Sequence, residues 1–247
     1  MKEYQSFGYG VNSVALAEEL DNKLLKLFSD TGNESNETYS YKIYYEQKHS
    51  DVIILNDPVQ GFNSLYDYCV NYKTVPHRRW RWCTDKFKRQ RLNNYYKNEG
   101  EVTVYLGIAY DERHRAKMEK KGKITYKYPL VENGVTRQNC IEIIQEAGLV
   151  VPPKSGCWFC PFQSKQSWLR LLRDHPDQYE LAVQLEKNSP PDVDLYPHGL
   201  EWLKGRVDLE LDQKQLFTDD WECNFCFIED DCTKTIICAK EEKKDEV

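Results

Sequence analysis

Apolar residues in the first half of the chain follow two alternating patterns. Four short apolar runs have the length and composition of buried strands, at residues 2–7, 23–29, 52–55 and 102–108. The segments between them have helical character, at residues 12–21, 36–48 and 62–73. Because strands and helices alternate with short connections, the pattern predicts a doubly wound α/β fold with a mainly parallel sheet of five strands.

The second half of the chain is mainly helical in pattern. Helices are predicted over residues 136–147, 164–174, 176–187 and 199–205. Pro190 and Pro191 lie among polar residues, which indicates a linker. We therefore expect an α/β domain over residues 1–175 and a helical, cysteine-rich extension over residues 176–247.

The composition is that of a soluble globular protein. Of the 247 residues, 40% are hydrophobic and 30% are charged, and no run of 18 apolar residues could cross a membrane. Met1 is followed directly by a predicted strand instead of an apolar signal region. We expect a cytoplasmic protein with no membrane partner.

Basic residues are concentrated in two stretches although the net charge is −6. His77–Arg91 contains seven Lys or Arg and one acid, and Arg113–Lys123 contains six Lys or Arg. This pattern favours a local phosphate-binding face. In the first stretch, Trp80 and Trp82 are interleaved with arginines, a combination that can stack on a base and hold phosphates. We therefore expect an RNA or DNA acceptor to bind residues 77–91; the alternative is a solvated helix face with two tryptophans packed inward.

A glycine-containing loop joins the first predicted strand to the first predicted helix. Its backbone N–H groups and hydroxyls, together with the helix dipole, could surround phosphate oxygens. The loop lacks the Gly-Lys-Ser/Thr ending of a Walker A motif and the third glycine of G-x-G-x-x-G. The alternative is a tight strand-to-helix turn, with Asn12 or Ser13 as the helix N-cap. The candidate phosphate-binding residues are Ser6, Phe7, Gly8, Gly10, Asn12 and Ser13.

Acidic residues follow two other predicted strands, at the strand ends where ligands bind in open α/β sheets. The first loop is Asp30-Thr31-Gly32-Asn33-Glu34, and the second contains Asp111, Glu112 and Arg113. A nucleotide-bound Mg²⁺ needs one or two carboxylates, which Asp30, Asp111 and Glu112 could supply, and arginine can neutralise phosphate charge. The alternative is that these are exposed acids paired with neighbouring arginines.

The chain has nine cysteines, and the reducing cytosol favours metal or redox roles for them over disulfides. Cys69 and Cys140 have apolar neighbours at helical spacing and are expected to fill the core. Cys83 precedes Thr84, a suitable helix N-cap, so we expect a thiolate at a helix N-terminus.

Two further groups of cysteines have ligand-like spacing. Cys157-x-x-Cys160-Pro is suited to a metal-ligand pair, an iron–sulfur ligand pair or a dithiol redox couple. A second set near the C-terminus has enough thiols for one zinc ion or a cluster; the alternative is an unliganded end. Its members are Cys223, Cys226, Cys232 and Cys238.

Several motifs in fixed order resemble the PP-loop adenine-nucleotide α-hydrolases, and within them the phosphoadenosine phosphosulfate (PAPS) reductase-like branch. They are the Ser-x-Gly-x-x-x-Ser-like loop, Asp30-Thr31-Gly32-x-Glu34, Cys83-Thr84-x-x-x-Lys88 and Gly107-Ile108-x-x-Asp111-Glu112-x-x-Arg115. The resemblance spans about residues 4–175 and implies a Rossmann-type fold that binds an adenine nucleotide and Mg²⁺. Asn12, where many PP-loop ATPases have aspartate, and Tyr9 depart from the pattern, so the loop alone does not establish ATP hydrolysis.

The resemblance also implies site residues. The nucleotide would contact the first loop, the 30–34 loop and Lys88. The catalytic residues would be Cys83, Asp111, Glu112 and Arg113. Relatives that thiolate tRNA bases hold a 4Fe–4S cluster with one cysteine and a Cys-x-x-Cys pair; the cysteines matching these in kind are Cys83, Cys157 and Cys160.

Three functional hypotheses follow. The first is a PP-loop enzyme that activates an acceptor with ATP, forming AMP and pyrophosphate, and transfers sulfur through an iron–sulfur cluster or a cysteine persulfide. The second is a PAPS or APS (sulfonucleotide) reductase, although Glu222-Cys223-Asn224 only partly matches the Glu-Cys-Gly segment of such enzymes. The third is a non-catalytic nucleotide-binding module with structural zinc. Expected partners are the adenine nucleotide, the acceptor and a sulfur-donor or reductant protein. In every case, we expect the first loop and the three thiols to share one cavity.

Overall fold

A computed structural model describes residues 2–49, 51–117, 119–191 and 193–211. Its sheet has six strands in the order β3-β2-β1-β4-β6-β5. The strands are β1 (Lys2–Phe7), β2 (Leu25–Ser29), β3 (Val52–Leu55), β4 (Val102–Leu106), β5 (Lys120–Lys121) and β6 (Ile124–Lys127). All neighbouring pairs are parallel except β5 with β6.

The predicted fold class is therefore confirmed, with one addition to the sheet. Strands β3, β2, β1, β4 and β6 form the five-stranded parallel sheet, and β5 adds a sixth, antiparallel edge strand of two residues. Lys120 and Lys121 are both exposed, so β5 has no apolar pattern that could have predicted it.

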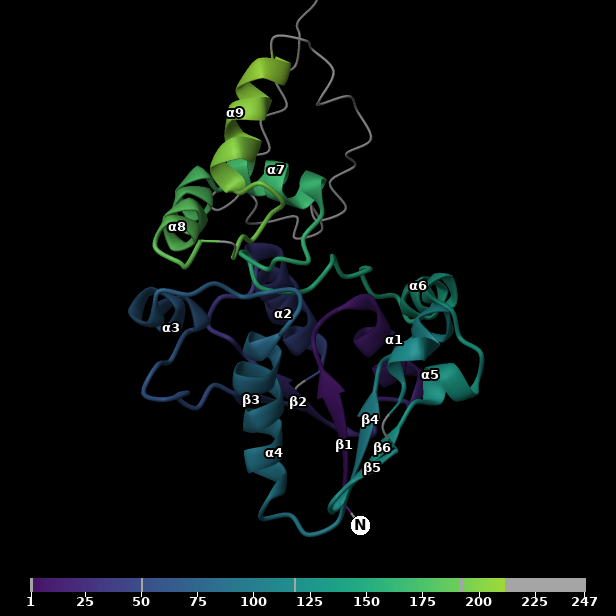
Figure 1. Ribbon diagram of the computed structural model, residues 1–247. Helices are drawn as coiled ribbons and strands as arrows, with labels where there is room; N and C mark the ends of the chain where they lie inside the picture. The colour runs from purple at the N-terminus through teal and green to yellow at the C-terminus, as the bar shows by residue number, and fades with distance from the viewer. Residues whose placement is uncertain (1, 50, 118, 192, 212–247) are drawn as a thin grey trace, which may run out of the picture. The chain divides into compact units, whose positions relative to one another are not determined.

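Helices connect the strands and follow the sheet. They are α1 (Val11–Glu19), α2 (Asn36–Lys48), α3 (Leu65–Tyr72), the π-helix η1 (Thr84–Arg89), α4 (Gln90–Tyr96), the 3-10 helix η2 (Tyr110–Arg115), α5 (Pro129–Glu132), α6 (Arg137–Glu146), α7 (Lys165–Asp174), α8 (Pro176–Lys187) and α9 (Leu200–Leu211). Figure 1 shows α1, α2 and α4 beside the strands, whereas α7, α8 and α9 form a separate group of helices.

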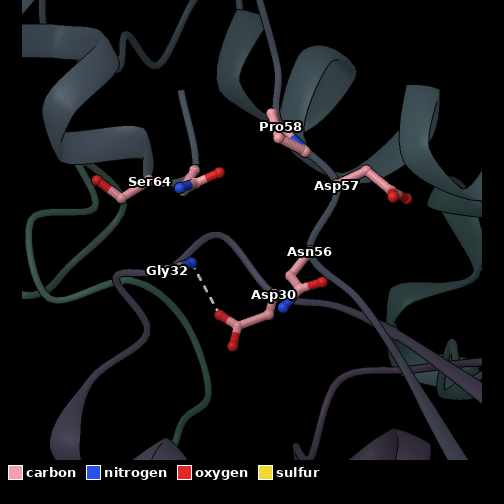
Figure 2. A pocket seen from close by; sticks show the side chains of 7 residues that line it. Asp30, Gly32, Asn56, Asp57, Pro58 and Ser64 are labelled. Carbon is pink, nitrogen blue, oxygen red and sulfur yellow. Dashed lines mark hydrogen bonds between the residues drawn. The ribbon is translucent and has the colours of Figure 1, made fainter. Parts of the chain in front are cut away.

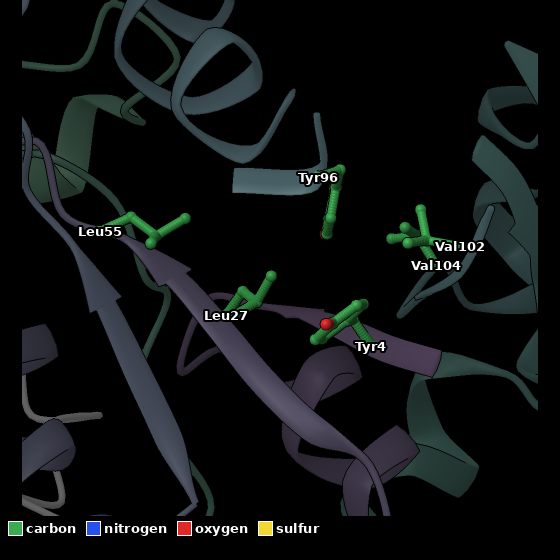
Figure 3. Close-up of a cluster of buried hydrophobic side chains, with 6 residues drawn as sticks. All are labelled: Tyr4, Leu27, Leu55, Tyr96, Val102 and Val104. Carbon is green, nitrogen blue, oxygen red and sulfur yellow. The ribbon is translucent and has the colours of Figure 1, made fainter. Parts of the chain in front are cut away.

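One face of the sheet packs against α4. Tyr96 of α4 points toward Tyr4 and Leu27 in the middle of the sheet (Figure 3), and Val102 and Val104 of β4 belong to the same buried cluster. Side chains alternate between the two faces of a strand, so Tyr4 and Leu27 share this face while their neighbours point the other way.

The opposite face packs against α1 and α2. The ring centroid of Phe7 lies 4.8 Å from that of Tyr9 and 5.1 Å from that of Tyr45 on α2. Gln5 is fully buried, and its side-chain amide donates to the Ser13 carbonyl of α1 at 2.6 Å. Helices thus cover both faces of the sheet, as a doubly wound fold requires.

Two predicted helix caps are wrong. Helix α1 begins after Gly10, so neither Asn12 nor Ser13 is its N-cap. Thr84 lies inside η1, and Cys83 is the residue that precedes that helix, without a side-chain capping bond. In the π-helix η1, backbone hydrogen bonds join residues five apart in the sequence instead of four apart as in an α-helix. Short π-helical segments of this kind are frequent at functional sites.

Helices α7, α8 and α9 pack together through Tyr179. Its ring meets Trp168 of α7 edge-on with centroids 6.3 Å apart, and its hydroxyl donates to the Leu200 carbonyl at 2.7 Å. The described residues up to Leu209 form one compact unit, and the domain boundary expected at residue 175 stays a prediction. The C-terminal cysteine set, Cys223 to Cys238, lies outside the described residues. Among the described helices, none has the length and apolar character needed to traverse a membrane.

Candidate functional site

A cleft opens where the chain order of the sheet reverses, between β1 and β4. Its volume is about 700 Å³. Phe7 at the end of β1, Ser29 at the end of β2, and Leu106 at the end of β4 line it. In open α/β sheets, ligands bind at this switch point, outside the carboxyl ends of the strands.

The predicted phosphate loop lies at this cleft, and all its candidate residues line it: Ser6, Phe7, Gly8, Gly10, Asn12 and Ser13. The loop amides of Gly8 and Gly10 donate to the Ser13 hydroxyl at 3.3 and 3.2 Å, and that hydroxyl donates to the Gly10 carbonyl at 2.9 Å. Two backbone N–H groups therefore converge on one oxygen at the start of α1. This is an arrangement that suits an anion oxygen at a helix N-terminus.

Tyr9 anchors the phosphate loop to the protein core. It has a φ of 51°, in the left-handed region that few non-glycine residues adopt, and its side chain is fully buried. Its hydroxyl donates to Glu46 at 2.5 Å, and its ring packs edge-on against Phe7 and Phe28. Burial and the Glu46 carboxylate raise the pKa of Tyr9. The residue that departs from the usual loop pattern thus anchors the turn, and packing offsets its backbone strain.

The end of β4 comes close to the first turn of α1. A Cβ on Gly107 would lie 2.6 Å from the Asn12 carbonyl oxygen and 3.0 Å from the Ser13 Cα. Both obstacles are backbone atoms, so only glycine allows this approach. Gly107 is the first residue of the Gly-Ile-x-x-Asp-Glu motif, and the contact gives that glycine a physical role.

Basic side chains line the cleft on the α6 and η2 side. The Arg115 guanidinium lies 2.8 Å from the Glu112 carboxylate, and both residues line the cleft. The Asn12 side chain donates to Glu112 at 3.3 Å and accepts from the Arg137 guanidinium at 3.4 Å. Asn12 therefore joins the phosphate loop to an arginine and to a carboxylate.

Sequence reasoning selected Arg113 in this region, whereas Arg115 and Arg137 line the cleft on this side and Arg89 lines it from η1. Arg113 lies instead over the ring of Tyr110, at 4.6 Å from its centroid. Arg115 is the last residue of the Gly-Ile-x-x-Asp-Glu-x-x-Arg motif, so the motif could have identified it as a site residue. Arg137 carried no motif and comes to the cleft only through the packing of α6.

Lys88 reaches the cleft from η1 and forms an ion pair with Glu34 at 3.2 Å. The Glu34 side chain is only 1% exposed and also accepts from the Thr31 hydroxyl at 3.0 Å. Burial disfavours the charged form of Lys88, but the Glu34 carboxylate and the thiols of Cys157 and Cys160 outweigh it and raise the pKa of Lys88. Lys88 stays protonated, with its charge at the cleft wall.

Cys157 and Cys160 share a hydrogen bond and have different proton affinities. The bond from Cys157, the backbone N–H of Phe162 and the charges of Lys88 and Lys154 lower the pKa of Cys160 to about 6, against the effect of burial. The same bond and burial raise the pKa of Cys157. These contacts favour the thiolate on Cys160 and the thiol on Cys157.

The expected thiolate at Cys83 is not favoured. Burial and the nearby Cys160 raise the pKa of Cys83, and together they outweigh the hydrogen bonds from Thr84 and the charge of Lys88. Cys69 and Cys140 are fully buried, which confirms the prediction that they fill the core. Burial raises the pKa of Cys140 to about 11.

The segment before Cys157 passes over the phosphate loop. Pro153, Lys154 and Ser155 line the cleft, and a Cβ on Gly10 would lie 2.6 Å from the Ser155 hydroxyl. Just after Ser155, Cys157 forms a β-bridge with Glu34, the partner of Lys88. The segment that leads to Cys157 therefore lies against the phosphate loop, but none of the thiols of Cys83, Cys157 and Cys160 lines the cleft, so the expectation that the loop and the three thiols share one cavity is not confirmed.

The loop after β2 lines a second, smaller pocket. Asp30 and Gly32 line it together with residues 56–58, 63 and 64, and its volume is about 500 Å³. Figure 2 shows Asp30 facing this pocket, with its carboxylate accepting from the Gly32 N–H at 2.8 Å. Thr31 and Glu34 are buried behind the loop.

The three candidate magnesium carboxylates do not line one cavity. Glu112 lines the main cleft and Asp30 lines the second pocket. The Asp111 carboxylate accepts from the Arg137 backbone N–H at 3.1 Å, at the first residue of α6. Of the three, Glu112 alone is placed to reach a cation on a nucleotide held in the main cleft.

Within residues 2–49, 51–117, 119–191 and 193–211, no three or more His, Cys, Asp or Glu are grouped as metal ligands. Cys160 interacts electrostatically with both Cys83 and Cys157, so the thiols are neighbours without forming such a group. The 4Fe–4S cluster and its zinc alternative therefore stay predictions.

The order of the strands and the position of the cleft define a doubly wound α/β fold with a cleft at its switch point. Among solved structures, the chain is similar to phosphoadenylyl-sulfate (PAPS) reductase from Candida auris in its phosphate complex, with a TM-score of 0.52 and 15% sequence identity. The match covers 64% of this chain and 82% of the reductase chain. No protein-family model and no curated protein matches the sequence. The chain therefore has the PAPS reductase-like fold that its motifs predicted.

Proposed function

We propose that this protein is an adenine-nucleotide-dependent enzyme of sulfur chemistry, which activates an acceptor with ATP and transfers sulfur to it through the Cys157–Cys160 pair. One observation carries the proposal: Lys88 lines the cleft of the phosphate loop and acts electrostatically on both thiols. The Lys88 ammonium could therefore act both on a bound phosphate and on the two thiols.

The cleft suits the phosphates of a nucleotide. The amides of Gly8 and Gly10 donate to the Ser13 hydroxyl, and a phosphate oxygen that takes the place of this hydroxyl would accept from both. Lys88, Arg115 and Arg137 line the same cleft and supply positive charge. Developing charge on transferred phosphoryl oxygens is stabilised by donors and cations that are already in place. These groups explain why the loop can serve without the lysine of a Walker A motif.

In the proposed reaction, an acceptor oxygen attacks the α-phosphorus of ATP, pyrophosphate leaves, and the oxygen carries AMP. A persulfide sulfur on Cys160, loaded by a sulfur-donor protein, then attacks the acceptor carbon, and AMP leaves with that oxygen. The Cys157 thiolate attacks the Cys160 sulfur of the resulting mixed disulfide. The acceptor leaves with the new sulfur, and a reductant protein supplies the electron pair that reduces the Cys157–Cys160 disulfide.

Mg²⁺, if held by Glu112 and the phosphates, would neutralise charge on the nucleotide. A 4Fe–4S cluster on the three thiols would supply an open iron that binds sulfide. No step proposed above passes through either group, and each step is assigned to the residues of the chain.

A second candidate function is sulfonucleotide reduction. The similarity in fold to a PAPS reductase favours it. The Cys160 thiolate would attack the sulfur of a sulfonucleotide bound in the same cleft, the bond from that sulfur to the phosphate oxygen would break, and the adenosine phosphate would leave, so that Cys160 carries an S-sulfonate. Cys157 would then attack the Cys160 sulfur, releasing sulfite and leaving a disulfide for a reductant protein to reduce.

The two candidates are separated by their products. Purified protein is incubated anaerobically with ATP, Mg²⁺, a persulfide donor and RNA or single-stranded DNA, and AMP and pyrophosphate are measured; a parallel reaction with PAPS or APS and a dithiol measures sulfite. AMP formation that requires the acceptor supports the first candidate, and sulfite supports the second. Lys88→Ala should impair the active reaction at least ten-fold, whereas Lys86→Ala, on the same helix but outside the cleft, should not. The proposal would be refuted if the protein bound no nucleotide and turned over neither ATP nor a sulfonucleotide.

A further inference from the structure

An exposed aromatic and basic surface lies beside the thiol-bearing segments. It consists of His77, Arg78, Arg79, Trp80, Arg81 and Phe162, and we call it the Trp80 surface. Trp80 is 66% exposed although its ring packs at a tilt against His77, with the ring centroids 4.6 Å apart. Phe162 is 47% exposed. Large apolar side chains left open beside charged groups indicate a binding surface.

Two guanidinium groups flank the ring of Phe162. The Arg81 Cζ lies 5.3 Å from the ring centroid and the Arg78 Cζ lies 6.0 Å from it. The Arg78 side chain also donates to the Pro161 carbonyl, which ties the two segments together. No acidic residue occurs in residues 77–84 or 157–165, so this surface is positive in a chain whose net charge is −6. Its charge therefore complements an anionic partner.

The Trp80 surface leads directly to the proposed site. Arg81 is two residues before Cys83, and Phe162 is two residues after Cys160. The Lys154 ammonium donates to the Phe162 carbonyl at 3.1 Å, and Lys154 also lines the main cleft. A polymer lying on this surface would have one of its units within reach of the cleft and the thiols.

We propose that the Trp80 surface binds a single-stranded nucleic acid, which is the acceptor of the proposed sulfur transfer. Exposed bases stack on aromatic rings in single strands, whereas duplex bases are already stacked on one another. Arginines beside those rings contact the phosphates that link the bases. This inference rests on the proposed function, because a sulfonucleotide reductase needs no such acceptor.

A matched aromatic and basic pair elsewhere provides the control. Trp202 on α9 is 44% exposed, and the Arg206 Cζ lies 5.1 Å from its ring centroid. Neither residue lines the main cleft. The pair has the same chemistry as the Trp80 surface but no relation to the thiol segments, so it reports non-specific binding to any exposed tryptophan and arginine.

The experiment measures binding of the full chain to fluorescein-labelled single strands and to a duplex of the same sequence, by fluorescence anisotropy at several salt concentrations. The variants are Trp80→Ala, Phe162→Ala, Arg79→Ala and the controls Trp202→Ala and Arg206→Ala. Thermal midpoints of all variants confirm that they fold. We expect single strands to bind more tightly than the duplex. Trp80→Ala or Phe162→Ala should weaken binding about 5-fold to 100-fold, and Arg79→Ala should lower the salt dependence.

Three results would overturn the inference: no binding of single strands by the wild type, equal binding of single strand and duplex, or equal losses in the Trp80→Ala and Trp202→Ala variants. ATP binding by the wild type is measured separately. If ATP binds and turns over with a small acceptor while no single strand binds, the proposed function stands and this inference fails. If no nucleotide binds, the proposed function fails whatever the oligonucleotide result.

Discussion

The Lys88 ammonium lies 3.2 Å from the Glu34 carboxylate, and this pair joins η1 to the loop after β2. The same carboxylate accepts from Thr31, and the backbone of Glu34 bridges to Cys157. Lys88 in turn lines the cleft beside the phosphate loop. The pair therefore connects three motifs that lie far apart in the sequence, and it places one positive charge between the phosphate loop and the thiols.

Replacing Lys88 tests this connection. Lys88→Met leaves the Glu34 carboxylate, 1% exposed, without its cation, and an unpaired buried carboxylate costs about 1–3 kcal/mol. We expect the free energy of unfolding, measured by urea titration at pH 7, to fall by that amount. Lys86→Met is the matched control, because the Lys86 ammonium bonds to the Tyr68 hydroxyl at 2.9 Å and to no buried carboxylate. Equal losses in both variants would contradict this prediction.

Cys160 should be the most reactive described thiol. With a pKa of about 6 it is mostly ionised at pH 7, whereas Cys140, with a pKa of about 11, is not. In chelator-treated, reduced protein, iodoacetamide at pH 7 should modify Cys160 first, and its alkylation rate should rise between about pH 5 and pH 7 and then level off. Peptide mass spectrometry identifies the modified residue. Preferential labelling of Cys157 would reverse the assigned roles of the two thiols.

Gly107 should tolerate no side chain. Gly107→Ala places a Cβ 2.6 Å from the Asn12 carbonyl oxygen, so the end of β4 or the first turn of α1 must shift to make room. We expect a loss of about 1–3 kcal/mol in the free energy of unfolding and at least ten-fold weaker ATP binding. The control Gly205→Ala, on α9, meets no atom within 4 Å and should stabilise the protein by about 0.5–1 kcal/mol. An unchanged ATP affinity in Gly107→Ala would mean that the contact between β4 and α1 does not position the phosphate loop for ATP binding.

Much of this architecture follows from local pattern. Apolar runs such as Val52–Leu55 are strands because they are bounded by polar turns. The helix predicted over Asn36–Lys48 has the same ends in the structure, where the Ser35 side chain caps it by accepting from the Thr38 N–H. The loop before α1 lines the main cleft, and the sequence indicated it because glycine and serine at a strand–helix junction form a turn with exposed N–H groups and hydroxyls.

What sequence reasoning missed depends on tertiary packing. Cys83 has a raised pKa because other segments bury it, and neighbouring residues in the sequence do not reveal that burial. Arg137 reaches the cleft because α6 packs on α1, and the strand β5 exists because β6 offers it an edge. The separation of Asp30 from Glu112 likewise arises from the path of the loops, which residue types alone do not determine.

Glu186 gives the α8–α9 region a pH-dependent stability. Its carboxylate accepts from the backbone N–H groups of Leu195 at 2.6 Å, Tyr196 at 3.3 Å and Leu200 at 2.6 Å, and so holds the start of α9. Burial nevertheless raises the pKa of Glu186 above its usual value of 4.5. The folded state then binds more protons than the unfolded state in the range just above pH 4.5, so the contribution of Glu186 to stability falls as the pH rises through that range.

The variant Glu186→Gln does not titrate, which isolates this effect. It also loses one acceptor oxygen, so we expect it to be less stable than the wild type by about 1 kcal/mol. Because the wild type gains from protonation at low pH, the difference between the two in urea unfolding should be larger at pH 4 than at pH 7. Glu180→Gln, on the same helix, should show the opposite trend, since the hydrogen bond from Gln184 lowers the pKa of Glu180. The same trend in both variants would mean that the pH dependence comes from the rest of the protein. In that case, the three backbone donors would fully offset the cost of burying the Glu186 carboxylate.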